Sequence, residues 1–544
     1  MSGADALEAW ADVLVLGGGP AGTWAALAAA GAGAEVVLAD KGYCGTSGAT
    51  ASGGNNLWLV EPGEARVRAA RARAEKGGHL TDDTWMARVL ETTWEQLDVL
   101  AAKGYPFPHD AAGAPVRSSL QGPEYMRRMR RAVHRAGVRL LDHHPALELV
   151  ADRDGVVSGA AGVARQDGGR PWRVRARAVV VATGGCAALA GGFGTNVDTG
   201  EGVLMAVEAG AELSGMEFST AYALAPEWGV HTKGRMLQWA TFYDERGEAL
   251  GAGDDGPGRQ LAQSLLGQGQ RVYARLDRAP REIHQKMRDA QPNYFVPLDK
   301  AGVDPFTTAY PLRMVYEGTV RGTGGLRVVT DDCATTVPGL YAAGDAATRE
   351  LVTGAISGGG SHNGAWAISS GTWAGRGAAR FALARGGVPD RVDALGRAGL
   401  RPSDGAAADV DAREVIAAAQ RHVLPPARTV LRTAAGLRAS QTELETLWGA
   451  AVPGLAGEGR ERLRARVAAS LVAHARWFTT AALARGESRG MHRRVDAPAA
   501  DPRLRHRLLT GGLDRVWTRP EGPPAPLSAP RPASPSTTRE EVPA

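Results

Sequence analysis

The sequence predicts an α/β fold in which one parallel sheet is assembled from separated parts of the chain. The first observation is that residues 12–40 give an apolar strand, a glycine turn, an alanine-rich helix, a second strand and an acid, in that order. The second is a pair of later apolar segments, 179–185 and 337–346, in which a strand is followed by glycine. The third is the Ala/Arg/Leu-rich stretch 407–485, whose helical spacing predicts a C-terminal bundle of antiparallel helices.

Residues 12–40 follow the order that a dinucleotide-binding site requires. The apolar run 13–16 suits a buried parallel strand, and two glycines then permit a tight turn and let the backbone approach a pyrophosphate. The third glycine lets the following helix pack closely on the strand, and the N-terminus of that helix offers free N–H groups to phosphates. An acid at the end of the second strand can accept hydrogen bonds from a ribose. The predicted ligand contacts are Gly17, Gly19, Pro20, Ala21, Gly22 and Asp40.

The position of this motif and two later segments favour FAD over NAD as the ligand. The motif lies at the extreme N-terminus of a long chain, and residues 337–346 add a strand that ends in Gly-Asp, whose carboxylate could bond a ribityl hydroxyl. Residues 179–185 form a third apolar strand, which ends in glycines that suit close approach of the backbone to a cofactor. Three distant strands that meet on one ligand indicate a flavoprotein of the two-dinucleotide type. The predicted contacts in these segments are Ala182, Thr183, Gly184, Gly344 and Asp345.

The composition is that of an ordinary soluble globular protein. The chain has 544 residues, 44% hydrophobic and 22% charged, which is enough for two or three domains. The net charge of +5 is modest for this length, and the Arg-rich stretches 127–131 and 493–494 are typical of solvated helix faces, so we expect no nucleic-acid partner. We find no apolar run long enough for a transmembrane segment and no basic-then-apolar leader, and we therefore expect no signal peptide.

The three cysteines, Cys44, Cys186 and Cys333, lie far apart in the sequence. This spacing argues against a disulfide framework and agrees with a reducing, cytoplasmic location. The sequence has no Cys-x-x-Cys motif. We therefore expect no metal site in this chain, neither an iron–sulfur cluster nor a structural zinc.

Changes in composition divide the chain into domains. Residues 1–225 and 319–385 contain the strand and glycine signals, and we assign them to the FAD-binding domain. Residues 226–318 are polar, Gln-rich and interrupted by glycine and proline, which indicates an inserted second domain over the flavin. Residues 386–517 hold the C-terminal helical pattern, and the Pro/Ser-rich stretch 518–544 is expected to be a disordered tail.

Several blocks beyond the glycine motifs carry a resemblance to a known family. They are Lys-Gly-Tyr-Cys-Gly-Thr-Ser-Gly-Ala-Thr-Ala-Ser-Gly-Gly-Asn-Asn at 41–56, the blocks 199–202 and 210–218, the stretch 276–286, and Glu-Ser-Arg-Gly-Met-His at 487–492. In this order they resemble the flavoprotein family of fumarate reductase, succinate dehydrogenase, L-aspartate oxidase and the adenylylsulfate reductase α-subunit. The resemblance covers nearly the whole chain.

The resemblance implies a Rossmann-like FAD-binding domain interrupted in sequence, an inserted α+β capping domain and a C-terminal helical bundle. It also implies an FAD-dependent oxidoreductase that transfers a hydride between flavin N5 and a small polar or anionic metabolite, with closure of the cap. Two alternatives stay open: a flavoprotein subunit that passes electrons to a partner iron–sulfur protein, and a flavin-dependent oxygenase or oxidase. Further predicted cofactor contacts are Lys41, Thr46, Ser47, Gly53, Gly54, Asn55 and Asn56. For the two asparagines, a role in a turn is the alternative.

Four positions depart from the family pattern. Members with covalent FAD carry a histidine where this chain has Ser47, so the resemblance implies non-covalent FAD. Tyr222 and Arg321 stand near positions that hold histidines in the dicarboxylate enzymes, and Ser357 stands where those enzymes have the substrate arginine. A C4 dicarboxylate needs cations at both ends, so these replacements argue against fumarate, succinate and aspartate as substrates.

Five residues are candidates for catalysis on this alignment. His362 follows the glycines near the flavin and could bind substrate or donate a proton, or it could instead cap the next helix. Arg259 aligns with the cap-domain arginine that acts as proton donor in the family, with a surface arginine as the alternative. Arg489 and His492 belong to the C-terminal motif that returns toward the active site. Tyr222 either redefines the pocket or merely fills it.

Overall fold

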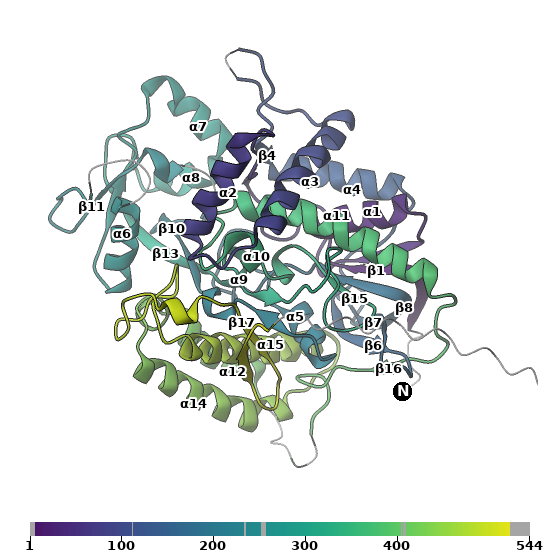
Figure 1. The fold of residues 1–544 in the computed structure, drawn as a ribbon. Coiled ribbons are helices and arrows are strands. Elements are labelled where there is room, and N and C mark those ends of the chain that lie inside the picture. The colour runs from purple at the N-terminus through teal and green to yellow at the C-terminus, as the bar shows by residue number, and fades with distance from the viewer. Residues whose placement is uncertain are drawn as a thin grey trace, which may run out of the picture.

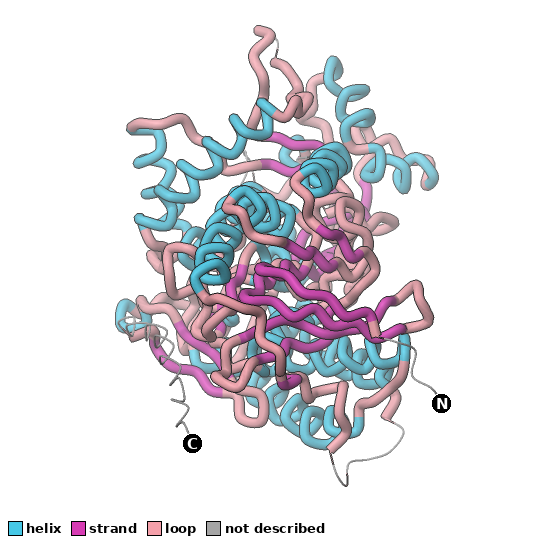
Figure 2. Tube along the Cα trace, turned by 90° about the vertical axis from the view of Figure 1, so that its right-hand side faces the viewer, coloured by secondary structure: helices cyan, strands magenta, loops and turns pink. Residues whose placement is uncertain are grey.

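The computed structural model describes residues 6–110, 112–232, 236–251, 257–403, 405 and 410–522. Its centre is an eight-stranded sheet with the order β16-β6-β7-β8-β1-β2-β5, in which β15 also pairs with β8. Figure 1 and Figure 2 show helices on both sides of this sheet. The strands are β1 (Leu7–Leu16), β2 (Val36–Ala39), β5 (Arg139–Leu141), β6 (Ala146–Ala151), β7 (Val157–Ala164), β8 (Arg170–Val181), β15 (Leu340–Ala342) and β16 (Asp393–Ala394).

The strand–helix–strand unit predicted from residues 12–40 forms around β1. Residues 13–16 pair in parallel with 36–39 of β2 and with 178–181 of β8, and β15 adds a further parallel strand beside β8. Because the sheet is covered on both faces, this part of β1 is a continuous apolar run. The strands β6, β7 and β16 pair antiparallel, so the sheet is mixed and not wholly parallel.

Helix α11 (Ser361–Ala384) packs against α1 (Pro20–Gly31) at very short range. A Cβ atom on Gly371 would lie 2.4 Å from the carbonyl oxygen of Ala21, and one on Gly375 would lie 2.2 Å from that of Ala25. Any larger residue at these positions would push the two helices apart. The glycines therefore let the first turns of both helices border one cavity.

The inserted domain has its own sheet and its own core. Its antiparallel sheet has the order β10-β13-β12-β11, and Phe242, Tyr294 and Phe295 are buried in a core separate from that of the central sheet. Since β10 begins at Ala221 and pairs with β13, the domain starts a few residues before the predicted boundary at residue 226. Its elements are β10 (Ala221–Pro226), η2 (Met236–Trp239), β11 (Thr241–Tyr243), α6 (Pro257–Gly267), β12 (Tyr273–Arg275), η3 (Arg281–Ile283), α7 (His284–Ala290), α8 (Pro292–Lys300) and β13 (Tyr310–Glu317).

The C-terminal region is a helical layer that a small sheet ties back to the FAD-binding domain (Figure 1). Helix α15 packs against α12 and α14. Residues 518–520, which the sequence assigned to the tail, complete β18, while residues 523–544 lie outside the described residues. The elements are α12 (Ala412–Val423), α13 (Pro426–Thr429), α14 (Ala434–Ala451), η5 (Val452–Gly454), α15 (Gly459–Ala484) and η6 (Pro502–Leu504), with the sheet β14 (Gly325–Leu326), β9 (Leu213–Ser214), β17 (Leu508–Gly511) and β18 (Trp517–Pro520).

The remaining elements surround the central sheet. The longest is α3, whose N-terminus is capped by Asp82, which accepts a hydrogen bond from the backbone N–H of Trp85. Within the described part of the chain, no helix combines the length and the apolar character needed to cross a membrane. These elements are β3 (Gly54–Asn56), α2 (Glu64–Lys76), α3 (Asp83–Ala102), β4 (Ser119–Gln121), α4 (Gly122–Arg135), α5 (Glu201–Glu208), η1 (Met216–Phe218), α9 (Gly318–Arg321), η4 (Gly344–Ala346) and α10 (Glu350–Thr353).

Candidate active site

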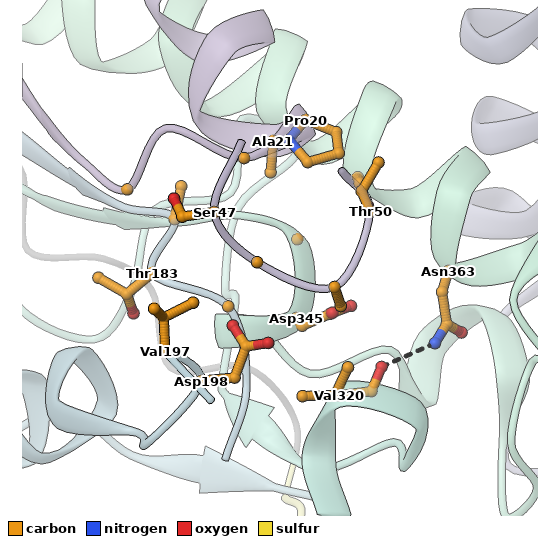
Figure 3. Close-up of a pocket in the computed structure, with 18 of the residues that line it drawn as sticks. Pro20, Ala21, Ser47, Thr50, Thr183, Val197, Asp198, Val320, Asp345 and Asn363 are labelled. Atoms are coloured by element: carbon orange, nitrogen blue, oxygen red, sulfur yellow. Dashed lines mark hydrogen bonds between the residues drawn. The ribbon is translucent and has the colours of Figure 1, made fainter. Parts of the chain in front are cut away.

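A cavity of about 560 Å³ lies where the central sheet meets the inserted domain. The carboxyl ends of β1, β2 and β8 open onto it, as do the first turns of α1, α5 and α11. Figure 3 shows side chains from these distant segments around one space. This is the crevice at the carboxyl ends of parallel strands where α/β proteins bind their ligands.

The glycine turn after β1 shapes one end of the cavity. Gly17 has a φ of +107°, and a Cβ there would lie 2.3 Å from the carbonyl oxygen of Ala182. Gly22 does not border the cavity; a Cβ there would lie 1.8 Å from the carbonyl oxygen of Gly17, so this glycine serves the close packing of α1 on the turn. Gly19 borders the cavity, and a Cβ on it would meet no atom within 4 Å. In this turn Gly17 and Gly22 are therefore tightly packed, whereas Gly19 faces the open space of the cavity.

Asp40 joins three segments at this end. Its two carboxylate oxygens accept hydrogen bonds from the backbone N–H of Gly18 at 2.5 Å, the backbone N–H of Gly42 at 2.7 Å and the hydroxyl of Ser47 at 2.8 Å. The neighbouring Lys41 donates to Glu201 Oε1 at 2.6 Å. The acid that sequence analysis assigned to a ribose therefore also fixes the glycine turn and the segment that follows β2.

The other end of the cavity collects polar groups from η4, α9 and α11. Asp345 Oδ1 accepts a hydrogen bond from Arg349 at 2.5 Å, and Asn363 Nδ2 donates to the carbonyl oxygen of Val320 at 3.0 Å (Figure 3). The hydroxyl oxygen of Thr183, at the end of β8, is buried and has no hydrogen-bond partner among the described residues. A buried hydroxyl without a partner is costly unless a ligand completes it.

Most of the predicted cofactor contacts meet at this cavity. Thr46 is exposed and bonds the carbonyl oxygen of Tyr43, and the carbonyl oxygen of Gly53 accepts a hydrogen bond from the backbone N–H of Gly122, so neither borders it. The predicted residues that line the cavity are Gly17, Gly19, Pro20, Ala21, Asp40, Lys41, Ser47, Gly54, Asn55, Asn56, Ala182, Thr183, Gly184, Gly344, Asp345 and Arg259.

Arg321 is the prominent charged group at the end of the cavity next to the inserted domain. Its Nε forms an ion pair with Glu317 Oε2 at 3.3 Å, and Glu317, which is 1% exposed, also accepts a hydrogen bond from the hydroxyl of Thr232 at 2.6 Å. The two Nη atoms of Arg321 have no hydrogen-bond partner among the described residues, and Nη1 would lie 3.5 Å from a Cβ on Gly360, the residue before α11. The guanidinium is thus held by one edge, while its other edge can bind an anion.

His362 does not border this cavity, although the sequence placed it near the flavin. Its ring stacks on that of Trp58 with 4.4 Å between the ring centroids, and its Nδ1 lies 3.0 Å from the carbonyl oxygen of Gly358. Burial and the nearby Arg73 guanidinium lower the pKa of His362 to about 3. A ring that is neutral and held in the wall is poorly suited to donate a proton to a ligand.

Arg489 and His492 lie in a buried network of the C-terminal segment and do not border the cavity. Arg489 pairs with Glu487 at 2.7 Å and donates to the carbonyl oxygen of Gly78. His492 contacts the Arg432 guanidinium, and burial lowers its pKa well below the ordinary value. These contacts hold the C-terminal motif in place.

Tyr222 also points away from the cavity. Its hydroxyl lies 3.0 Å from the carbonyl oxygens of both Val423 and Leu424, at the end of α12, and close to the hydroxyl of Thr429. Burial raises the pKa of this phenol well above its ordinary value. Of the five residues proposed for catalysis, Arg259 alone borders the cavity.

Sequence reasoning named Arg321 as a departure from the family pattern but missed other residues at the charged end. Glu317 stands four residues before Arg321, a spacing that a reader could notice, and Gly359 and Gly360 come immediately before a helix, as the glycines of the N-terminal motif do. Thr232 and Gln238, which reach the cavity from the inserted domain, carry no such signal. Only the tertiary fold brings them there.

Comparisons with known proteins match both the N-terminal and the C-terminal parts of the chain. A family model described as an FAD binding domain matches residues 12–227, and one described as the fumarate reductase flavoprotein C-terminal region matches residues 421–512. L-aspartate oxidase of Caulobacter vibrioides is 29% identical over 535 residues, which cover 90% of this chain and 94% of that protein. L-aspartate oxidase of Streptomyces coelicolor is 28% identical over 393 residues, and that match spans 62% of this chain and only 63% of the relative.

A solved structure extends the likeness to the whole fold. A variant of the E. coli quinol fumarate reductase FrdA superposes with a TM-score of 0.78 at 19% identity, over 95% of this chain and 98% of that one. The cavity and the matched domains define this protein as an FAD-dependent oxidoreductase. Both matched models and the L-aspartate oxidase relatives make the chain similar to the flavoproteins of the fumarate reductase and succinate dehydrogenase family, in agreement with the resemblance of the sequence blocks.

The cavity fits the FAD that this family implies. Glycines border it where a Cβ would enter open space, at Gly19, Gly48 and Gly359, and Thr183 offers a buried hydroxyl without a partner. Bound there, FAD supplies hydride-transfer chemistry, which no side chain can provide.

Proposed function

We propose that this protein transfers a hydride to or from a small anionic metabolite that Arg321 anchors beside the flavin. The observation that carries the proposal is the free edge of the Arg321 guanidinium in the cavity, with its Nε held by Glu317. A planar guanidinium binds a carboxylate through two parallel hydrogen bonds. The adjacent N-terminus of α11 adds the positive end of a 24-residue helix.

The inserted domain would close the site over the metabolite. Arg259, Gln238 and Thr232 reach the cavity from this domain, so its closure would exclude water and place a second cation opposite Arg321. No His, Tyr or Cys lies among the described residues that line the cavity, and we propose that Arg259 exchanges the substrate proton. In this role Arg259 would correspond to the cap-domain arginine that acts as proton donor in the family that the sequence resembles.

The substrate is the finer part of the proposal. L-aspartate oxidases are among the relatives, which supports an amino acid as a candidate, but Ser357, at the predicted arginine position, does not line the cavity. Because we assign the proton transfer to Arg259, Arg321 alone is left to bind a carboxylate. We therefore propose a small monoanionic acid as the favoured class, with L-aspartate as the reference compound.

The direct test is anaerobic mixing of the holoprotein with a panel of small acids while the visible flavin absorbance is followed. We expect bleaching by a monocarboxylate and its loss in the Arg321→Gln variant. Bleaching that persists in Arg321→Gln would contradict the proposal. The reduced wild-type flavin is then exposed to air and to dyes. Reoxidation by air would favour an oxidase, whereas reoxidation only by dyes would favour the alternative in which a partner iron–sulfur protein accepts the electrons.

We further propose that FAD is held without a covalent bond. Ser47 borders the cavity where the covalent members of the family carry histidine, and its hydroxyl is committed to Asp40. Acid precipitation of the purified protein should leave the yellow colour in the supernatant. Colour that stays in the pellet would show a covalent flavin and refute this part.

A further inference from the structure

Arg349 is a buried arginine that bonds both Asp345, the predicted ribityl contact, and the backbone around Arg321. Its side chain is 0% exposed, and burial lowers its pKa from the ordinary value. Burying a charged group this deeply is costly, and hydrogen bonds from its two Nη atoms offset the cost, while its Nε has no partner among the described residues. Its partners therefore indicate what the residue does.

One partner lies on the cofactor side. Arg349 Nη1 donates to Asp345 Oδ1 at 2.5 Å, and the Asp345 side chain is itself 21% exposed, at the border of the cavity. Asp345 follows the strand β15 and is the predicted ribityl contact. Figure 3 shows Asp345 and Val320 near one another at the same side of the cavity.

The other partners lie on the turn that carries Arg321. Arg349 Nη2 donates to the carbonyl oxygens of Thr319 at 2.8 Å, Val320 at 3.4 Å and Gly322, which are the residues around Arg321. Asn363 donates to the same Val320 carbonyl from α11. The backbone of α9 is thus held from two sides, while the guanidinium of Arg321 keeps its outer edge open.

We infer that Arg349 is a positioning residue that couples FAD binding at Asp345 to the placement of Arg321. The inference rests on the proposed role of Arg321 as anion anchor. A ligand that fixes Asp345 fixes the Arg349 guanidinium, and the guanidinium fixes the carbonyls of α9. Because this linkage is thermodynamic, a bound anion would strengthen FAD binding by the same factor.

The test uses Arg349→Lys and Asp345→Asn, singly and together, in FAD-saturated protein with acetate as the probe anion. A lysine keeps the charge toward Asp345 but cannot supply the planar fork that reaches three carbonyls as well. We expect each single variant to weaken acetate binding, measured by the visible difference spectrum, by about 5- to 150-fold. The double variant should bind acetate scarcely more weakly than either single variant, because both substitutions disrupt the same Asp345–Arg349 connection.

The results of these measurements distinguish failure of the inference from failure of the proposed function. Acetate affinity in Arg349→Lys within about twofold of wild type, or effects of the two substitutions that simply multiply, would overturn the inference. If Arg349→Lys does not fold, Asp345→Asn alone decides, because it removes the Asp345–Arg349 hydrogen bond and leaves the Arg321 side chain itself unchanged. Arg321→Gln is the control: unchanged acetate binding in that variant would refute the proposed function instead. Titration of the apoproteins with FAD should show weaker cofactor binding in Arg349→Lys and not in Arg321→Gln.

Discussion

The two ends of the cavity differ in whether main chain or side chains form the wall. At the nucleotide end the main chain forms the wall: a glycine turn, strand ends and the first turn of α1, with Asp40 tied to backbone N–H groups. At the charged end, where we propose that substrate binds, the wall includes charged and polar side chains from the inserted domain, α9 and α11. A wall of main chain accepts one ligand shape and tolerates few substitutions. A wall of side chains can be changed residue by residue while the fold stays intact.

The largest expected effect comes from Gly19, at the nucleotide end. Gly19→Val should weaken FAD binding by at least about 100-fold, because its side chain would occupy cavity space that the cofactor needs, and each tenfold corresponds to about 1.4 kcal/mol. The fold should survive, since a Cβ at this position meets no atom within 4 Å. FAD titration and the thermal unfolding of the apoprotein measure the two effects. Tight FAD binding by a folded Gly19→Val protein would show that the cofactor does not occupy the space beside Gly19.

Gly17→Val is the matched control for that substitution. Gly17 has a φ of +107° and faces the carbonyl oxygen of Ala182 at 2.3 Å from the would-be Cβ. Here the substitution should destabilise the protein itself by about 1–3 kcal/mol or more, before any cofactor is added. Equal apoprotein stability of the two variants would show that the turn is not packed as described.

The next effect comes from Arg321, at the substrate end. Arg321→Gln should lower kcat/KM for the true substrate by about 10- to 150-fold, as expected for the loss of a charge-assisted hydrogen bond of about 1.5–3 kcal/mol. FAD affinity and thermal stability should stay close to wild type. Steady-state kinetics and FAD titration of the same preparation check both parts. A loss of FAD affinity in Arg321→Gln without any anion present would mean that Arg321 itself binds the cofactor.

A further effect is expected at Glu350, a buried carboxyl outside the cavity that accepts a hydrogen bond from the Ser214 hydroxyl at 2.5 Å. Burial and the neighbouring Glu217 raise the pKa of Glu350 to about 8, from 4.5. The folded protein then keeps a proton that the unfolded chain releases, so stability is full below pH 4.5 and falls as the pH rises through 8, by at most about 1.4 kcal/mol per pH unit. Glu350→Gln should match wild type at pH 5 and exceed it at pH 9 in urea unfolding.

The exposed Glu95 provides the control for this experiment. Glu95→Gln should change stability little and equally at both pH values. A Glu350→Gln variant that is no more stable than wild type at pH 9 would show that Glu350 is ionised in the fold at neutral pH.

The smallest effect is expected at His362. Since its ring is stacked on Trp58 and lies outside the cavity, His362→Gln should keep turnover within about threefold of wild type. The pH profile of kcat should also be unchanged, because the pKa of His362 is near 3 and the ring is neutral over the working range. If the pH dependence of kcat on the acidic or the basic side disappears in His362→Gln, this histidine takes part in the reaction after all.

The contrast between the two ends also explains what the sequence could predict. Gly17, Asp40 and Asp345 belong to short local patterns in which strand, turn and helix follow one another, so the residues reveal their neighbours. The sequence neighbourhood of His362 predicted a place near the flavin, but the ring stacks on Trp58, which is far away in the sequence, and no local pattern reports that contact. Thr232 meets Glu317 across a long stretch of chain, and no local pattern reports such a meeting.

The spacing between Glu317 and Arg321 constrains how this protein can diversify. Glu317 is the last residue of β13, the strand by which the chain leaves the inserted domain, and Arg321 follows four residues later at the end of α9. Insertion of one residue between them would rotate the arginine by about 100° around the turn and remove its free edge from the cavity. Loops of the inserted domain can therefore change in length during evolution or engineering, whereas the exit from this domain has a fixed length.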